Sequence, residues 1–372
     1  MKQHHSLAIL LGLLLMTLTF AILAKPSTPL NPQTVVASWD VENSHKKINM
    51  TLPERLAKVT WHIDQSQYPG QENKHYGRAR ALLKPFISDD YLQSIDETID
   101  NNQQIQLLYL WARVMQHQHQ FALAEKILNQ AQKLQKQYNT NVTLLKASVQ
   151  LAQGDFAQAK KTCGELIGQA QLVTAAACTL EASAQLQQLP ESYQQMTALL
   201  NNQRTFAENS LNNWLLQITA EMALHLDLPN EAQQWLEKGL SDNKNLHIKP
   251  LSFTVLWADV QLALGQPLAV LRQLGSLVDK AGFKDDALLS RLAIAETHTA
   301  QTRWQSLFKK RVNLRIARND VYHAADIARY YIYVRPNAIE ALYWASLNWQ
   351  QAKLNDDKIL LEKAKIMQSD QL

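Results

Sequence analysis

The sequence predicts an all-α protein, a right-handed α-solenoid of about seven helical hairpins with one extra helix near residues 285–299. The first reason is a repeat: residues 105–166 contain one pattern twice, so that Ala147 repeats Ala112 and Phe156 repeats Phe121 after 35 positions. A period of this length is typical of stacked helix pairs. The second reason is that only 10 Gly and 11 Pro interrupt 372 residues, while Ala, Leu and Gln abound, which favours helix.

The charge and hydrophobic content exclude some classes of protein. The formal net charge is only +4, and the basic residues are scattered except in one helix, so we expect no nucleic-acid partner. A hydrophobic content of 46% is ordinary for a folded chain.

The N-terminus has the features of a secretory signal peptide. Lys2 precedes an uncharged apolar run, Leu7–Leu23, that ends at Ala24. We expect cleavage after Ala24 and export to the periplasm or cell envelope. The alternative is an uncleaved membrane anchor, because the run is nearly as long as the roughly 18 residues that span a bilayer. Residues 25–52 are expected to form an extended linker.

The solenoid is expected to occupy residues 53–372 and to begin with a divergent hairpin over 53–100. Pro53 belongs in the first turn of its first helix. A second helix starts near Lys74, and a short one follows over 88–100.

The main repeats are expected over about 105–353. At one hairpin turn, Gly154 supplies a positive φ, Asp155 caps the next helix and Phe156 packs into the hairpin. Prolines that suit a first helical turn stand where three further second helices begin, at Pro190, Pro229 and Pro267.

The C-terminal repeats contain a spacing anomaly. Val270 and Ala324, read as equivalent positions, are 54 residues apart. The excess over one repeat is about one helix, which we assign to an inserted or unpaired helix at 285–299. A capping helix at 356–368 ends the array, because its polar outer face suits a terminal position.

Gly154-Asp155-Phe156-x-x-Ala159 resembles the helix–turn of tetratricopeptide repeats. Together with Tyr76-Gly77-Arg78-Ala79-x-Ala81-Leu82-Leu83-x-Pro85, it is similar to a group of exported bacterial tetratricopeptide proteins. The resemblance implies export and helical repeats, and it supplies no active site.

Cys163 and Cys178 are the only two cysteines. They are expected on consecutive antiparallel helices, and in an oxidising compartment they are candidates for a disulfide. The alternative is two buried thiols that face different neighbours.

Two surfaces are candidates for binding a partner. The first helices of the hairpins offer residues for the concave face of the solenoid: Tyr109, Arg113, Trp214, Gln217, Glu221 and Asp259. Residues 303–318 include Lys309, Arg311, Asn313, Arg315 and Arg318 and no acidic residue. They are candidates for binding an anionic partner, although a solvated face balanced by Asp320 and Asp326 is the favoured interpretation.

In the tetratricopeptide family, a Lys and an Asn four residues apart begin a clamp for a chain-terminal carboxylate, and Lys309 and Asn313 have that spacing. The later members of the clamp do not appear in this sequence, so the clamp is not expected.

We expect no catalysis and no cofactor. The sequence contains no Gly-rich phosphate loop, no G-x-S-x-G and no H-E-x-x-H motif. His117-x-His119 is too small a set for a metal site. The expected function is therefore an exported adaptor or scaffold that binds a protein or peptide. The alternatives are an accessory or hydrolytic factor acting on cell-wall or surface polymer, and a membrane-anchored subunit of an envelope assembly complex.

Overall fold

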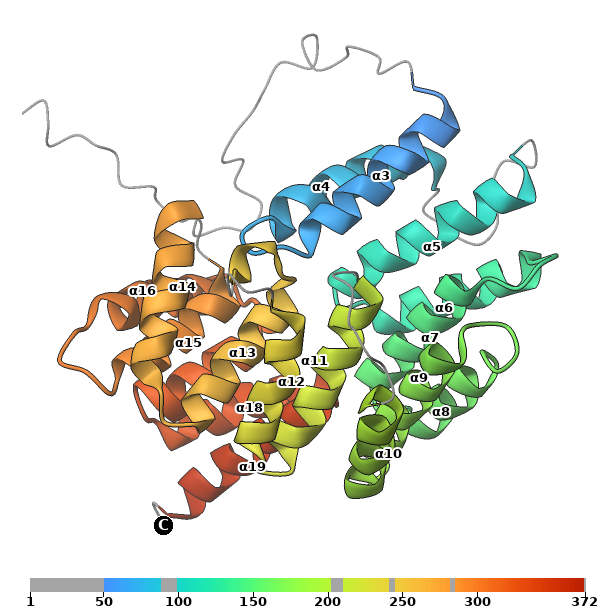
Figure 1. Cartoon of the computed structure of the whole chain (residues 1–372). Helices are drawn as coiled ribbons and strands as arrows, with labels where there is room; N and C mark the ends of the chain where they lie inside the picture. Colours follow the sequence, from blue (N-terminus) through green and yellow to red (C-terminus); the bar gives the residue numbers. More distant parts are fainter. Residues whose placement is uncertain (1–49, 88–98, 202–209, 241–244, 282–284, 371–372) are drawn as a thin grey trace, which may run out of the picture. The chain divides into compact units, whose positions relative to one another are not determined.

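The computed structural model describes residues 50–87, 99–201, 210–240, 245–281 and 285–370. The expected signal peptide, the linker up to residue 49 and most of the short helix at 88–100 lie outside the described residues. Within them every regular element is a helix and no strand occurs, which confirms the predicted all-α repeat fold (Figure 1). None of the described helices has the length and apolar character needed to cross a bilayer.

Seventeen α-helices are found in the described part of the chain. The first nine are α3 (Leu52–Ser66), α4 (Glu72–Leu83), α5 (Asn101–His117), α6 (Phe121–Leu134), α7 (Thr140–Gln153), α8 (Phe156–Gly164), α9 (Leu172–Gln185), α10 (Leu189–Asn201) and α11 (Ser210–His225). The remaining eight are α12 (Pro229–Gly239), α13 (Leu251–Ala263), α14 (Pro267–Ala281), α15 (Asp286–Glu296), α16 (Arg303–Ala317), α17 (Ala324–Arg329), α18 (Ala338–Gln351) and α19 (Asn355–Ser369). A π-helical turn, η4 (Tyr330–Val334), extends α17.

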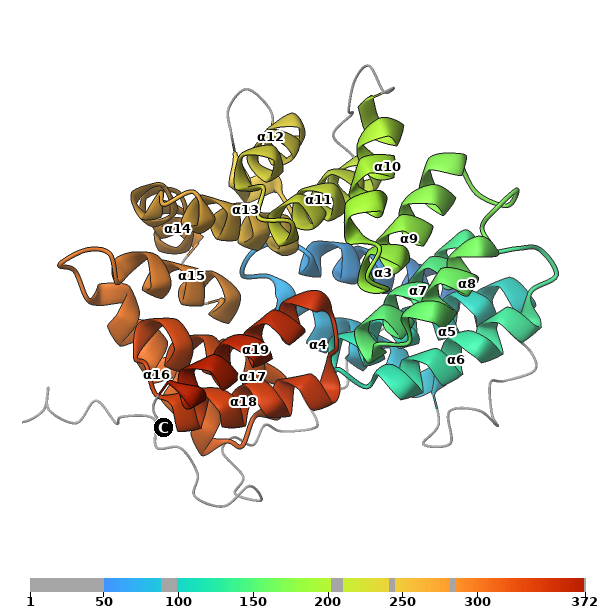
Figure 2. The same ribbon diagram turned by 90° about the horizontal axis from the view of Figure 1, so that it is seen from below.

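Each helix packs mainly against its neighbours in the chain, and the odd-numbered helices from α3 to α19 also contact one another in succession. Figure 2 shows the helices following one another in this order. The packing is that of a repeat array, in which every helix pair buries its apolar side against the next pair. The buried residues form three large clusters, over α3–α7, α9–α13 and α13–α19. We call the odd-numbered helices the inner helices, because they line the cavities described below.

The predicted helix ends are mostly confirmed. Pro53, Pro229 and Pro267 lie in the first turns of α3, α12 and α14. Gly154 ends α7 with a φ of +84°. Asp155 occupies the N-cap position of α8, but its side chain makes no capping hydrogen bond, so the predicted capping role is wrong.

The helix at 285–299 exists as α15, but it is not unpaired. It packs against α14 and α16 and contacts α13 and α17, so it occupies an ordinary inner position. The left-handed turn residue that follows α5, α7, α9, α11 and α13 occurs again at Asn319, after the even-numbered α16. The turn is thus one helix out of phase with the earlier ones. This shift explains why Val270 and Ala324 are separated by about one helix more than a full repeat.

Residues 353–355 return to the middle of the array. The backbone N–H of Lys353 donates to the carbonyl oxygen of Ala152, at the end of α7, over 3.0 Å. The backbone N–H of Asn355 donates to Oε1 of Gln185, at the end of α9, over 3.1 Å. These bonds join segments that lie some 170 or more residues apart, and they bring the start of α19 to the inner helices.

Candidate functional site

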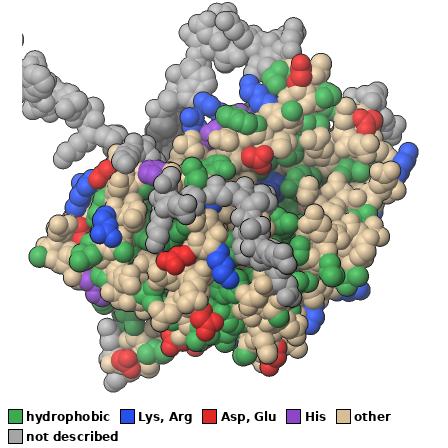
Figure 3. Space-filling view, viewed as in Figure 1, with side chains coloured by type: hydrophobic (Ala, Val, Ile, Leu, Met, Phe, Trp, Pro, Cys, Tyr) green, Lys and Arg blue, Asp and Glu red, His purple; other side chains and the backbone are tan. Residues whose placement is uncertain are grey.

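Two cavities are lined by inner helices in the described structure. The first cavity has a volume of about 680 Å³ and is lined by α5, α7, α9 and α11. The second cavity has a volume of about 570 Å³ and is lined by α11, α13, α15, α17 with η4, and α19. The face of the molecule in Figure 3 shows acidic and basic side chains interspersed, without a patch of one sign.

Arg113 is the cation of the first cavity. Its Nη1 donates to the hydroxyl of Tyr109, one turn earlier on α5, over 3.3 Å, and its Nε is buried without a hydrogen-bond partner. Burial raises the pKa of Asp64, and the nearby positive charge of Arg113 opposes this shift only in part. No carboxylate among the described residues lies within ion-pair distance of Arg113. Its charge is therefore available to a ligand in the cavity.

Glu181 and Trp214 lie on the other side of the first cavity, on α9 and α11. Burial raises the pKa of Glu181 to about 7, although a hydrogen bond from the Trp214 side chain opposes this shift. At neutral pH this carboxyl group is divided between its neutral and charged forms. The first cavity thus combines a fixed positive charge, an aromatic wall and an acid that titrates near pH 7.

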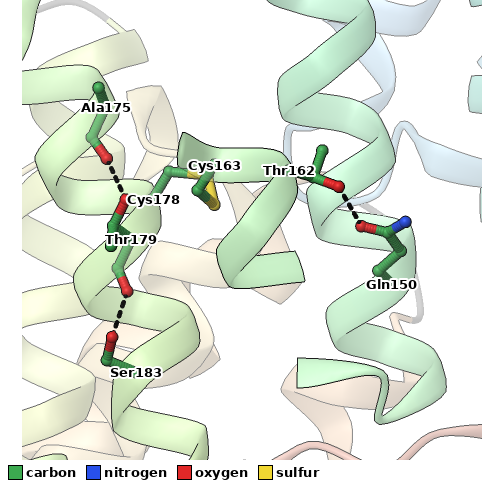
Figure 4. The surroundings of a disulfide bond; sticks show 7 residues. All are labelled: Gln150, Thr162, Cys163, Ala175, Cys178, Thr179 and Ser183. Carbon is green, nitrogen blue, oxygen red and sulfur yellow. Dashed lines mark hydrogen bonds between the residues drawn. A yellow bond between two sulfur atoms is a disulfide. The ribbon is translucent and has the colours of Figure 1, made fainter. Parts of the chain in front are cut away.

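The disulfide supports the wall of the first cavity. Cys163 of α8 and Cys178 of α9 are bonded with their Cα atoms 5.5 Å apart, which confirms the sequence prediction (Figure 4). Cys178 lines the cavity one turn before Glu181. Beside the disulfide, the hydroxyl of Thr162 donates to Oε1 of Gln150 over 2.8 Å and ties α8 to α7. These links hold α7, α8 and α9 in a fixed relation.

The second cavity contains a buried ion pair. Nε and Nη2 of Arg291 donate to the two carboxylate oxygens of Asp259 over 2.9 and 2.7 Å. The Arg291 side chain is only 7% exposed. This bidentate geometry, with both charges matched, is the arrangement in which a buried pair is best compensated for lost hydration.

Three further groups meet where α11 faces the start of α19. Nε2 of His225 lies 2.7 Å from Oδ1 of Asp356. Glu221 lies one turn earlier on α11. One of its carboxylate oxygens, Nε2 of His225 and Oδ1 of Asp356 all lie within 4.8 Å of one another. Burial, and then the charge of Asp356, raises the pKa of Glu221 to about 8. Burial also disfavours the charge on His225, but the hydrogen bond with Asp356 raises the pKa of His225 overall.

The sequence candidates divide into two groups in the structure. Those of the first helices all lie on inner helices: Tyr109, Arg113 and Trp214 line the first cavity, Asp259 lines the second, and Glu221 joins His225 and Asp356. Gln217 is also on α11, where its Oε1 accepts from the Ser252 hydroxyl over 2.9 Å.

The candidates of residues 303–318 lie on α16 and, for Arg318, at its C-cap, away from the linings of both cavities. Lys309, Asn313 and Arg318 are exposed there. Arg311 donates to Asp286 of α15 over 2.6 Å, and Arg315 donates to both Asp286 and Asp320. Asp286 thus neutralises much of the charge of this helix, and the ion pair of Arg315 with Asp320 confirms that Asp320 helps to balance this face.

Sequence reasoning missed His225, Arg291 and Asp356. The i, i+4 spacing of Glu221 and His225 was a usable signal, because it places both side chains on one helix face. No local signal connects them to Asp356, which comes 131 residues after His225.

No family model matches the chain. No curated protein matches it either. Among solved structures, a structure of Naa15/Naa10 bound to HypK-THB is similar at 13% identity and a TM-score of 0.30, over 86% of this chain and 61% of that chain. This chain therefore spans less than two thirds of the chain it matches. The similarity is too low to support any inference about partner or activity.

Proposed function

We propose that this chain is an exported helical-repeat adaptor that binds a peptide or protein segment against its inner helices and has no catalysis of its own. The observation that carries the proposal is Arg113, a largely buried cation that faces the first cavity with no carboxylate to match it. A buried charge without a counter-charge is costly. An incoming carboxylate would offset that cost, and it is the ligand that the arginine fork suits best.

The rest of the cavity suits a peptide. Tyr109 and Trp214 offer aromatic surface with few rotatable bonds, as binding anchors do. Polar side chains of α5 and α7, among them Gln116, Asn141 and Ser148, also line the space and can bond a peptide backbone. A volume of about 680 Å³ is within the range of cavities that hold small ligands. It would admit a short acidic segment or a chain end.

Export is supported by two features. The N-terminal sequence is typical of a signal peptide, and the disulfide belongs to oxidising compartments. We therefore place the protein in the periplasm or envelope. Mass spectrometry of the protein from its native cells is expected to find Lys25 at the N-terminus. An intact residue 1 in the membrane fraction would favour an anchored subunit instead.

The binding test uses fluorescently labelled peptide pools with free or amidated C-termini and acidic or neutral side chains, measured by anisotropy. Arg113→Gln is expected to weaken binding of the best acidic pool about 10- to 100-fold, since a hydrogen bond to a charged group is worth about 1.5–3 kcal/mol. Arg113→Lys keeps the charge and should retain part of the affinity. The matched control is Arg272→Gln, which removes an exposed cation from α14. Equal affinity of the wild type and Arg113→Gln, with circular dichroism unchanged, would refute the proposal.

Glu181 adds a pH dependence with a definite sign. Because its pKa is raised to about 7, deprotonation adds a negative charge to the first cavity as pH rises through 7. Anionic peptides should therefore bind more weakly at pH 8 than at pH 6, and Glu181→Gln should remove the difference. The same acid also favours the hydrolytic alternative, because a carboxyl group with this pKa suits general acid catalysis. Cleavage of cell-wall polymer that is lost in Glu181→Gln would support that alternative.

A further inference from the structure

The cluster of Glu221, His225 and Asp356 combines an imidazole nitrogen with two carboxylate oxygens. These ligand atoms are all within 4.8 Å of one another. Ligand atoms around a zinc ion stand about 2.0–2.2 Å from the metal, so the three groups need only small side-chain movements to share one ion. The imidazole favours transition metals over Mg²⁺ and Ca²⁺, which prefer all-oxygen sites.

The three ligand groups come from two helices that are far apart in the sequence, so the fold brings them together. Glu221 and His225 share one face of the last turns of α11. Asp356 is in the first turn of α19, and Asn355 beside it is held to Gln185 of α9 by a 3.1 Å hydrogen bond. The geometry is therefore supported from two separate elements, as a preorganised site requires.

A second observation points to a ligand. No hydrogen-bond donor among the described residues contacts the carboxylate of Glu221, although the group lies among inner helices and within 4.8 Å of the other two ligand atoms. A carboxylate in such a place normally has donors or a cation. Access is also available, because His225 and Asp356 line the second cavity and the Asp356 side chain is 57% exposed. The cavity would admit the metal and a water molecule as fourth ligand.

The other charged groups around the cluster do not satisfy Glu221. They come from α9, α13, α15, α17 and α19 and are Glu181, Asp259, Arg291, Arg329 and Asp357. Arg291 is bound by Asp259, and Arg329 lies 3.8 Å from Asp326. Asp357 accepts from Asn348 and from the backbone N–H of Leu354. Because both arginines are matched by their own carboxylates, neither is left to neutralise Glu221 when its carboxyl group is ionised, and a divalent cation would do so.

We propose that Glu221, His225 and Asp356 bind one divalent transition-metal ion of the zinc class, which ties α19 to α11. Protons compete with the metal for carboxylate and imidazole ligands, so the affinity rises with pH. The site is structural in kind: it closes the contact between the last helix and the middle of the array, and it is independent of peptide binding in the first cavity.

The test is calorimetric titration of untagged, chelator-treated protein with ZnCl₂ at pH 7.5, with CoCl₂ absorption as a second measurement. We expect one equivalent of Zn²⁺ to bind, no comparable binding of MgCl₂, and a visible Co²⁺ spectrum. Glu221→Gln, His225→Gln and Asp356→Asn should each weaken Zn²⁺ binding about ten-fold or more. His247→Gln and Glu362→Gln remove an exposed imidazole and carboxylate elsewhere and should leave the affinity unchanged.

Two further readouts keep the result interpretable. Repeating the Zn²⁺ titration at pH 6.5 should show weaker binding than at pH 7.5, because protons compete with the metal for its ligands. Excess Zn²⁺ should raise the Tm of the wild type by several degrees, but not that of a variant that folds normally by circular dichroism. Zn²⁺ binding that all three ligand variants retain, or no Zn²⁺ binding at pH 7.5, would overturn the proposal.

Discussion

Reduction of the Cys163–Cys178 disulfide should destabilise the middle of the array by an amount that follows from the loop it closes. The two residues are separated by 15 positions. In the chain-entropy treatment, a cross-link over about 15 residues stabilises the folded state by about 3 kcal/mol through restriction of the unfolded chain. Both side chains are almost fully buried, at 0% and 3% exposure. Reduced thiols would keep nearly the same packing, so loss of the cross-link should dominate.

The assay compares oxidised protein, reduced protein and the Cys163→Ala/Cys178→Ala variant. Because repeat arrays need not unfold in a single step, hydrogen exchange resolved by segment is more informative than a global midpoint. A loss of about 3 kcal/mol corresponds to a roughly hundredfold fall in protection, and we expect it in α8 and α9. Helices α13 and α14 lie outside the closed loop and serve as the internal control.

The entropic argument would be refuted by reduced protein whose α8 and α9 amides keep the protection of the oxidised form. If protection of α8 and α9 falls only in the alanine variant, the cause is the lost side-chain volume at the two buried positions. If protection falls equally in α13 and α14, the array unfolds as one unit. The loss of stability would then be measured from the global unfolding transition.

Three other predictions concern single sites. His62 and His75, whose Nδ1 atoms are 2.9 Å apart, have pKa values lowered mainly by burial. Below about pH 6.5 the unfolded chain therefore binds more protons than the folded chain. The free energy of unfolding measured in urea should fall as the pH drops below that value. Stability that is constant between pH 7.5 and 5.5, or equally pH-dependent in His75→Gln, would contradict this. Asp286→Asn leaves two arginines of α16 without their shared carboxylate and should cost about 2–3 kcal/mol in urea unfolding, whereas a loss below about 0.5 kcal/mol would indicate solvent screening. Gly154→Ala forces a Cβ onto a residue with φ +84° and within 3.0 Å of Lys353, so a loss of about 1–2 kcal/mol is expected; a neutral result would mean that Lys353 moves freely and the turn is unstrained.

The inner-face candidates illustrate how far helical periodicity reaches. Tyr109, Arg113 and Trp214 were assigned from their places on first helices, and the structure sets all three around one cavity. The inference works because side chains three or four residues apart share a helix face, and stacking aligns that face from one hairpin to the next. Helical periodicity does not show which of the charged residues on the inner helices form ion pairs. Asp259 is bound by Arg291, whereas Arg113 has no carboxylate within ion-pair distance in the described chain.

The basic helix shows the opposite case. Its sequence contains no acidic residue, so Arg311 and Arg315 were candidates for binding anions, although a face balanced by Asp320 and Asp326 was the favoured interpretation. The missing charge is supplied by Asp286, 25 and 29 residues earlier on α15. The pairing depends on α15 lying directly beside α16. The spacing of Val270 and Ala324 predicted an extra helix in this segment, but it did not show that Asp286 would face Arg311 and Arg315.

The sequence by itself determined the helices, the repeat period, the positions of several turns and the nearness of the two cysteines. All of these arise from interactions within about one hairpin, where the spacing of apolar, small and helix-breaking residues is sufficient. Only the tertiary structure decided the pairing of Asp286 with Arg311 and Arg315, the return of residues 353–355 to α7 and α9, and the meeting of Asp356 with His225. These features depend on small rotations between successive helix pairs, which accumulate along the array and which no single stretch of sequence specifies.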